Sequence, residues 1–317
     1  MVPTFNRRAI VLRTVEALFA QSLPATDYEI IVVVDGSIDG TAAALRLLRP
    51  PCQFSVVEQE NKGPSAARNT GYRAAAANLV LFLDDDMLSD PGLVAAHLAE
   101  HRRRDRIVAF GSLYLSPDSP PSIAAECFNR EIGSLYLERK RNSQREWQIA
   151  DCVFSNASLA RSLLEEVGGF DETFRKREDL ELGVRLLDSG AQIHYLENAV
   201  AYQYFEKTAA DLIRDAEAFA EADVMFAHRH PTALIKGQLN WLDQEPRWKR
   251  HVRQMAATVP LISDLLLTPI HAGAEICSGL PGFRDIGVRA LQIRRRIHWY
   301  RKVLELGWYK HSVGTED

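Results

Sequence analysis

Short runs of apolar residues alternate with helix-forming segments through the first half of the 317-residue chain. The runs 29–34 and 79–83 are almost entirely apolar, which is typical of strands buried on both faces of a sheet. Helix signals fill residues 39–48 and 64–77 between the strands. This order predicts an α/β fold, in which a mostly parallel sheet is flanked by helices and joined by right-handed crossovers.

Acidic residues follow two of these strands. Asp35 ends the first run, and the triplet Asp84, Asp85 and Asp86 follows the second. Ligands of such sheets bind beyond the carboxyl ends of the strands. If the triplet continues the strand, Asp84 and Asp86 point to one side, which suits a hard cation such as Mg²⁺ or Mn²⁺. The alternative is a solvated acidic turn.

Basic residues surround an expected helix start in the segment 61–71. Pro64 stands where the first helical turn begins, with Lys62 before it and Arg68 one turn later. The free N–H groups and the dipole of a helix N-terminus favour phosphate. The alternative is an ordinary helix whose Arg68 faces solvent.

The composition excludes several classes of protein. Hydrophobic residues make up 46% of the chain, and the net charge is −4, so a disordered chain or a general polyanion binder is not expected. The four cysteines have no zinc-site spacing, and no signal peptide opens the sequence, so we expect a cytoplasmic protein. The first strand is short, and whether it is abbreviated or begins upstream is left open.

Five segments together resemble a known family. They are residues 2–7 (Val-Pro-Thr-Phe-Asn-Arg), 35–41, 61–69, 82–86, and 167–172 with 177–183. In this order and spacing they resemble family 2 glycosyltransferases of the GT-A fold, over roughly residues 1–205.

The resemblance implies an inverting transfer of a sugar from a nucleotide-diphosphate donor to an acceptor hydroxyl. It implies that Asp179 is the general base and that Mn²⁺ or Mg²⁺ is bound by Asp86 and Asp84. The residues implied for the nucleotide and donor are Thr4, Asp35, Lys62, Arg68, Asp84 and Asp85. Those implied for the acceptor and sugar side are Asn156, Asp171 and Glu178.

The same features also have structural interpretations. Acids in a first helical turn stabilise the helix dipole, which alone could explain Glu178 and Asp179.

Many family members carry a second acid where this chain has Val34, and a metal-binding histidine in a late strand. Residues 199–204 hold no histidine. Base recognition therefore falls to Asp35 alone, and we expect weak metal binding.

We expect a GT-A nucleotide-sugar-binding and catalytic domain at residues 1–205 and a helical extension at 206–317. Residues 245–317 hold 12 Lys and Arg against 7 Asp and Glu, whereas residues 1–244 hold 26 against 35. The basic helices either lie on an anionic membrane at the inner face or pack on the catalytic domain with a solvated arginine face.

The expected partners are a nucleotide-diphosphate sugar and a glycan or lipid-linked acceptor, and the acidic body argues against nucleic acid. A homodimer is left open. Glycan synthesis for a polysaccharide, a glycolipid or the cell envelope is the expected setting. The competing functions are a sugar nucleotidyltransferase, which releases pyrophosphate, and a non-catalytic nucleotide-sugar-binding scaffold.

Overall fold

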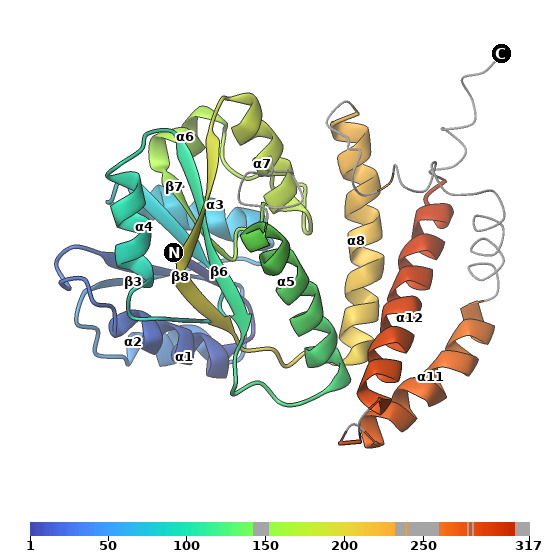
Figure 1. Cartoon of the computed structure of the whole chain (residues 1–317). Helices are drawn as coiled ribbons and strands as arrows, with labels where there is room; N and C mark the ends of the chain where they lie inside the picture. The colour runs from blue at the N-terminus through green and yellow to red at the C-terminus, as the bar shows by residue number, and fades with distance from the viewer. Residues whose placement is uncertain (142–151, 232–238, 240–259, 278, 281, 308–317) are drawn as a thin grey trace, which may run out of the picture. The chain divides into compact units, whose positions relative to one another are not determined.

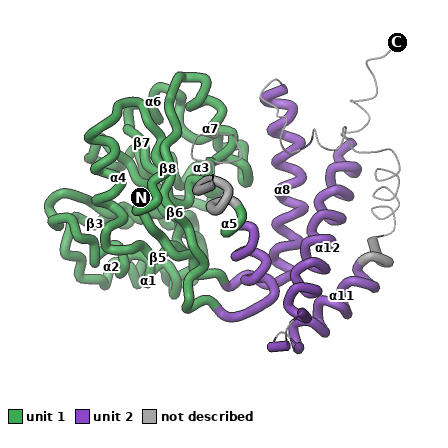
Figure 2. Tube along the Cα trace, viewed as in Figure 1, with its two compact units in different colours: residues 1–119, 132–205 green, residues 120–131, 206–317 purple. Residues whose placement is uncertain are grey.

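The computed structural model of the chain describes residues 1–141, 152–231, 239, 260–277, 279–280 and 282–307. The chain divides into two compact units, which Figure 2 distinguishes by colour. The first unit contains residues 1–119 and 132–205, and the second contains residues 120–131 and 206–317.

The first unit begins with a parallel sheet of three strands. Its order is β1 (Val2–Thr4), β2 (Glu29–Asp35) and β3 (Gln53–Gln59). The connecting helices are α1 (Arg8–Phe19) and α2 (Thr41–Arg46). In β2 every residue after Glu29 is buried, as expected for a strand covered on both faces.

A second, mixed sheet has the strand order β4-β7-β6-β8-β5. Its strands are β4 (Leu79–Leu83), β5 (Met87–Ser89), β6 (Ile107–Leu115), β7 (Asn156–Ala160) and β8 (Gln192–Gln203). Only β6 and β8 run parallel, and the other neighbours are antiparallel. The sheets join where the Leu83 N–H donates to the Met1 carbonyl, which places the start of β1 beside the end of β4.

Helices cover both faces of these sheets (Figure 1). On one face lie α3 (Pro64–Ala74), α6 (Arg161–Glu166) and α7 (Glu178–Asp188), over a core that includes Val33 and Phe110. On the other face α4 (Leu93–His101) packs on alternate residues of the same strand β6, such as Ala109. The α/β architecture expected from the sequence is confirmed.

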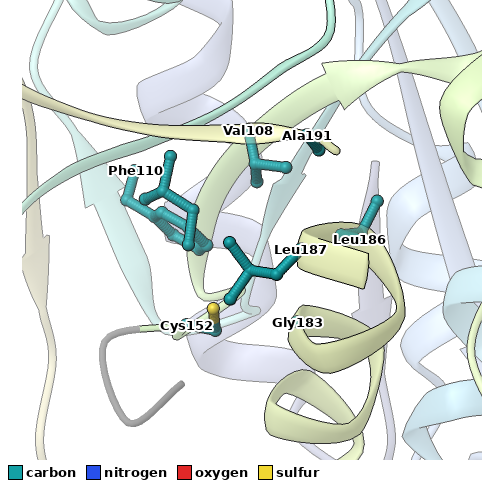
Figure 3. Close-up of a pocket in the computed structure, with 8 residues that line it drawn as sticks. Val108, Phe110, Cys152, Gly183, Leu186, Leu187 and Ala191 are labelled. Atoms are coloured by element: carbon teal, nitrogen blue, oxygen red, sulfur yellow. The ribbon is translucent and has the colours of Figure 1, made fainter. Parts of the chain in front are cut away.

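Helix α7 packs closely on the segment before β7, because Gly183 faces Cys152 there. A Cβ atom at Gly183 would lie 2.6 Å from the Cys152 Sγ. A small apolar pocket beside this contact is lined by residues of β6, α7 and β8, among them Val108 and Leu187 (Figure 3). Its lining carries no polar side chain other than the cysteine thiol, so we assign it to packing.

The second unit is helical. It contains α8 (Ala209–Arg229), α11 (Pro260–Ile276) and α12 (Phe283–Glu305), together with the first turns of α5 (Ile123–Arg141). Helix α12 packs against α8 and α11. At Gly287 the absence of a side chain allows close contact with Ile123 and Ala274.

Several basic residues of α12 pair with acids of the same unit. Arg294 lies 3.0 Å from Asp264, Arg295 lies 2.6 Å from Glu131, and Lys302 lies 2.8 Å from Glu221. Arg294 and Arg295 are thus paired with acids and not solvated, whereas packing on the catalytic domain and contact with a membrane stay predictions. None of the described helices combines the length and the apolar character that a membrane-spanning helix needs.

The first unit ends at residue 205, but residues 120–131 belong to the second unit. The division into a catalytic domain at 1–205 and an extension at 206–317 stays a prediction. Residues 120–131 are an exception to it, because they lie within the predicted catalytic domain but belong to the second unit. Residues 308–317, which include the last aromatic residues of the basic tail, lie outside the described part of the chain.

Candidate functional site

Two buried carboxylates lie where β1 and β4 end. The Thr4 hydroxyl donates to Asp85 Oδ2 at 2.7 Å. Arg7 Nη1 lies 2.6 Å from Asp85 Oδ1 and 3.0 Å from Asp86 Oδ2, so one guanidinium nitrogen serves both carboxylates. The Gln203 amide, at the end of β8, donates to Asp86 Oδ2 at 3.1 Å. Three strand ends therefore contribute side chains to one small polar cluster.

The acidic triplet is a turn and not a continuation of β4. The Met87 N–H donates to the Asp84 carbonyl, which closes the turn. Side-chain alternation therefore stops at Leu83, and the expectation that Asp84 and Asp86 share a side by strand geometry is wrong. Asp85 and Asp86 share Arg7, whereas Asp84 pairs with a different cation.

That cation is Arg68, a buried residue of α3. Its Nη2 lies 2.7 Å from Asp84 Oδ1 and its Nη1 lies 2.7 Å from Glu178 Oε1. Burial alone would lower the pKa of Arg68, but the two carboxylates outweigh it and raise that pKa, so the side chain stays charged. The Arg68 Nε–H is buried and has no hydrogen-bond partner among the described residues.

Aromatic packing supports the position of Arg68. The guanidinium lies over the Phe170 ring, 5.6 Å from its centroid, and that ring packs edge-on against Phe82 and Phe154. The Asn69 amide both donates to the Phe170 carbonyl and accepts from its N–H. The loop before α7 is thus fixed on α3.

Asp179 lies in the first turn of α7, next to Glu178. Desolvation by burial, followed by the charge of Glu178, raises the pKa of Asp179 to about 7. The neighbouring charges of Arg177 and Arg68 oppose this rise. Arg177 has φ of 62°, a left-handed conformation that a non-glycine residue rarely adopts. The carboxylate that the resemblance implies as the base therefore has a proton affinity suited to neutral pH.

Asp35 organises the two loops beside β2. Its Oδ1 accepts from the Gln59 amide and the Lys62 N–H, and its Oδ2 accepts from the Gly63 N–H. Gly36 has φ of 75°, and a Cβ atom there would lie 2.7 Å from the Asn61 nitrogen. The structure therefore brings the Lys62 backbone to Asp35, while the Lys62 side chain is exposed.

Two of the sequence-predicted residues have other surroundings. Asp171 accepts from the backbone and hydroxyl of Thr173, which shapes its own turn. The buried Asn156 amide donates to the carbonyls of Ser112 and Ala199 and meets His97 Nε2 at 3.0 Å. The Asn156 side chain therefore faces α4, and the structure does not bring it to the acidic cluster.

The surroundings of the acidic turn fit a hard divalent cation. Asp86 Oδ1 is buried and has no hydrogen-bond partner among the described residues. Burial, with mutual repulsion between the carboxylates, raises the pKa of Asp85 to about 7 and also raises that of Asp86. Excess buried negative charge and an unpartnered carboxylate oxygen are what such a cation would satisfy. The described residues form no preorganised cluster of three metal-binding side chains.

Arg7 and Gln203 are members of the cluster that the sequence patterns did not select. Arg7 stands inside the segment 2–7, but no local pattern shows that it reaches residues almost 80 positions later. Gln203 pairs with Met87 across β5 and β8, a register that depends on the whole sheet.

Comparisons with known proteins indicate the family of this chain. Residues 1–168 match the model of glycosyl transferase family 2. Validoxylamine A glucosyltransferase of Streptomyces hygroscopicus subsp. jinggangensis is 32% identical over 217 residues, covering 59% of this chain and 50% of the relative. The chain thus spans about half the length of this relative.

Solved structures support the fold. Mannosyltransferase PcManGT from Pyrobaculum calidifontis, in complex with GDP-Man and Mn²⁺, has a TM-score of 0.61 at 18% identity, covering 98% of this chain and 86% of its own. Residues 1–349 of S. aureus TarS, in complex with UDP-GlcNAc, have a TM-score of 0.52 at 18% identity, covering 95% and 90%. The fold is that of GT-A glycosyltransferases, and the family model matches more than half of the chain. The chain belongs to glycosyl transferase family 2.

Proposed function

We propose that this chain is an inverting glycosyltransferase, which moves a sugar from a nucleoside-diphosphate sugar to an acceptor hydroxyl. The observation that carries the proposal is the ion-pair chain from Asp84 through Arg68 to Glu178. It joins the acidic turn after β4 to the first turn of α7, where Asp179 has a pKa of about 7. A donor-binding acid and a base suited to neutral pH therefore belong to one connected site.

The donor is assigned to the strand-end cluster. Asp35 would hold the nucleobase, since its carboxylate has lone pairs beyond those used by three N–H donors. Arg68, with its unpartnered Nε–H, and Lys62 would face the phosphates. Thr4, Asp84 and Asp85 complete the donor side. The GDP-Man and UDP-GlcNAc complexes of the structural neighbours support a nucleotide-sugar donor.

Asp86 and Asp84 would hold Mn²⁺ or Mg²⁺. The unpartnered Asp86 Oδ1 supports this assignment, as does the Mn²⁺ in the PcManGT complex. A cation bound there supplies Lewis-acid neutralisation of the diphosphate leaving group. Within the chain, Thr4 and Gln203 orient the carboxylates through neutral hydrogen bonds.

Asp179 would accept the proton of the acceptor hydroxyl as its oxygen attacks the anomeric carbon. The nucleoside diphosphate leaves from the opposite face, which inverts the configuration. Glu178 and Asp171 lie on the proposed acceptor side, and Glu178 acts through its ion pair with Arg68. Asn156 stays a predicted residue of the sugar site, and its amide donates hydrogen bonds to the carbonyls of Ser112 and Ala199. The acceptor is proposed to be a glycan or lipid-linked hydroxyl.

A thermal-shift screen of UDP, GDP, dTDP and CDP sugars with Mn²⁺ tests the donor assignment. A matching donor at 100 times its Kd should stabilise the chain by about 2.7 kcal/mol. Asp86→Ala should lose the Mn²⁺-dependent part of the shift. The exposed Asp105 is a matched control, and Asp105→Ala should keep the shift. A chain that responds to none of the donors would contradict the proposal.

A further inference from the structure

Arg7 is the basic residue that pairs with both buried carboxylates of the acidic cluster. It precedes α1, and its side chain is 29% exposed, whereas those of Asp85 and Asp86 are 9% and 7% exposed. The same nitrogen, Nη1, contacts Asp85 Oδ1 and Asp86 Oδ2 at 2.6 Å and 3.0 Å. The guanidinium thus approaches the buried carboxylates from the more open side of the cluster.

A divalent cation and this guanidinium would compete for the Asp86 carboxylate, because Arg7 contacts its Oδ2 while its Oδ1 has no partner among the described residues. Mg²⁺ binds carboxylate oxygens at about 2.0–2.1 Å, and the like charges of cation and guanidinium repel strongly at contact distance. Arg7 Nη1 already contacts one oxygen of each carboxylate. A cation bound at Asp86 therefore favours a position of Arg7 away from the carboxylates.

The carboxylates keep other contacts when Arg7 moves. Asp85 Oδ2 accepts from the Thr4 hydroxyl, and the Asp85 carbonyl accepts from the Thr14 hydroxyl. Asp86 Oδ2 accepts from Gln203. Because these donors are neutral, they hold the turn in place without opposing a cation.

The displaced guanidinium would have an anion within reach. Thr4, at the end of β1, binds Asp85 of the acidic turn, so a diphosphate over this turn would lie beside the loop that carries Arg7. A planar guanidinium binds phosphate oxygens in a bidentate manner, and a long, partly exposed side chain can turn to do so.

We propose that Arg7 exchanges partners during donor binding. It neutralises Asp85 and Asp86 when the site holds no cation, and it binds the donor diphosphate once a divalent cation takes the Asp86 carboxylate. Arg7 is then both a competitor of the metal and a ligand of the leaving group. This inference rests on the proposed metal-assisted use of a nucleoside-diphosphate sugar.

Two titrations of Arg7→Gln against the parent chain test this exchange. The first measures Mn²⁺ binding alone by calorimetry, and the second measures a nucleoside diphosphate at saturating Mn²⁺. The probe is whichever of UDP, GDP, dTDP and CDP gives the parent its largest thermal shift. We expect Mn²⁺ to bind Arg7→Gln at least about fivefold more tightly and the nucleoside diphosphate at least about fivefold more weakly, the lower end of typical coupling between sites.

The two affinities are expected to change in opposite directions, which distinguishes partner exchange from a structural role. A misfolded variant would instead bind both Mn²⁺ and the nucleoside diphosphate more weakly. The neighbouring, exposed Arg8 is the matched control, and Arg8→Gln should change neither titration. If circular dichroism shows that Arg7→Gln is unfolded, Arg7→Lys replaces it. This variant should bind the nucleoside diphosphate at least about fivefold more weakly with no loss of Mn²⁺ affinity, since a lysine lacks the bidentate geometry.

Unchanged or weaker Mn²⁺ binding by a folded Arg7→Gln would overturn the exchange while leaving the proposed function intact. Undiminished binding of the nucleoside diphosphate would overturn it as well. A parent chain that binds neither Mn²⁺ nor any of the four nucleoside diphosphates would overturn both this inference and the proposed function.

Discussion

At the residue scale, the surroundings of Asp179 raise the pKa of its carboxyl group to near neutral pH. Burial and the adjacent Glu178 carboxylate raise its pKa to about 7, against the opposing charges of Arg177 and Arg68. A general base works best when its pKa lies near the operating pH. The ion pair of Glu178 with Arg68 links this property to the donor side of the site.

We expect kcat/KM, at saturating Mn²⁺, to rise with pH up to about 7 and then level off, as Asp179 loses its proton. Glu178→Gln removes the adjacent negative charge and leaves Arg68 with one carboxylate fewer. Both changes favour the ionised Asp179, so the midpoint of the profile should move to lower pH. A pH–rate profile of the two proteins measures this shift, and an unchanged or higher midpoint would show that Glu178 does not tune the base.

Metal binding should compete with protons at the acidic turn. The pKa of Asp85 is raised to about 7 and that of Asp86 is raised from its usual value near 3.8. The stability that protonation of Asp85 contributes is therefore complete below pH about 4 and is lost as the pH rises through about 7. Since a bound cation needs ionised carboxylates, the Mn²⁺-induced rise in Tm should be larger at pH 8 than at pH 5.

Differential scanning calorimetry at the two pH values measures this dependence, with Asp86→Ala as the variant that should show little Mn²⁺ effect at either pH. An equal rise at both pH values in the parent chain would argue against Asp85 and Asp86 as the residues that respond to the metal.

At the element scale, local patterns predicted the buried strands and the helix that carries the base. The sequence predicts β4 at its observed bounds, and it predicts a helix over residues 178–188, which is α7. Each of these elements has a strong local signal, either a continuous apolar run or a helical pattern that ends before Gly190.

Long-range pairing explains what local patterns did not predict. Residues 192–196 and 199–204 each have the pattern of a short strand, which predicts two strands. The structure has one strand, β8, because β6 pairs with it along its length through a register shift at Gly111 and Ser112. Likewise, Arg68 and Glu178 are 110 positions apart, and only the packed fold brings them together. Local patterns therefore selected acidic residues as candidates for the site, but they did not indicate which residues those acids pair with.

Two helical glycines should respond in opposite ways to alanine. At Gly183 in α7 a Cβ atom would lie 2.6 Å from the Cys152 Sγ, whereas at Gly133 in α5 it would meet nothing within 4 Å. Gly183→Ala should therefore destabilise the chain by about 1–3 kcal/mol through overpacking. Gly133→Ala should stabilise it by about 0.5–1 kcal/mol, since glycine is unfavourable within a helix. Urea denaturation measures both, and equal effects would contradict the packing described for α7.

At the scale of the whole molecule, the chain crosses between its two units more than once. Residues 120–131 leave the first unit and pack with α11 and α12 in the second. There the Ile123 N–H donates to Glu275, and Arg295 pairs with Glu131. Ile123 and Cys127 are buried by this packing. The second unit is therefore completed by a segment from the first half of the chain.

A chain that ends at residue 205 should be less stable than the full chain. It keeps residues 120–131 but lacks the helices of the second unit that bury Ile123 and Cys127. We expect a lower Tm and increased binding of an apolar dye, because newly exposed apolar surface binds such probes. Ile123→Ser within the shortened chain should reduce the dye signal. A shortened chain with the Tm and dye binding of the full chain would show that the segment does not depend on those helices.

Analysis of the released nucleotide tests the central claim most directly. The full chain is incubated with Mn²⁺ and the donor sugar that gives the largest thermal shift, and the products are separated by chromatography. We predict release of the nucleoside diphosphate without pyrophosphate, with inversion at the sugar carbon, and loss of release in Asp179→Asn while that variant still binds the donor. Release of pyrophosphate, or full activity in Asp179→Asn, would contradict the account of this site.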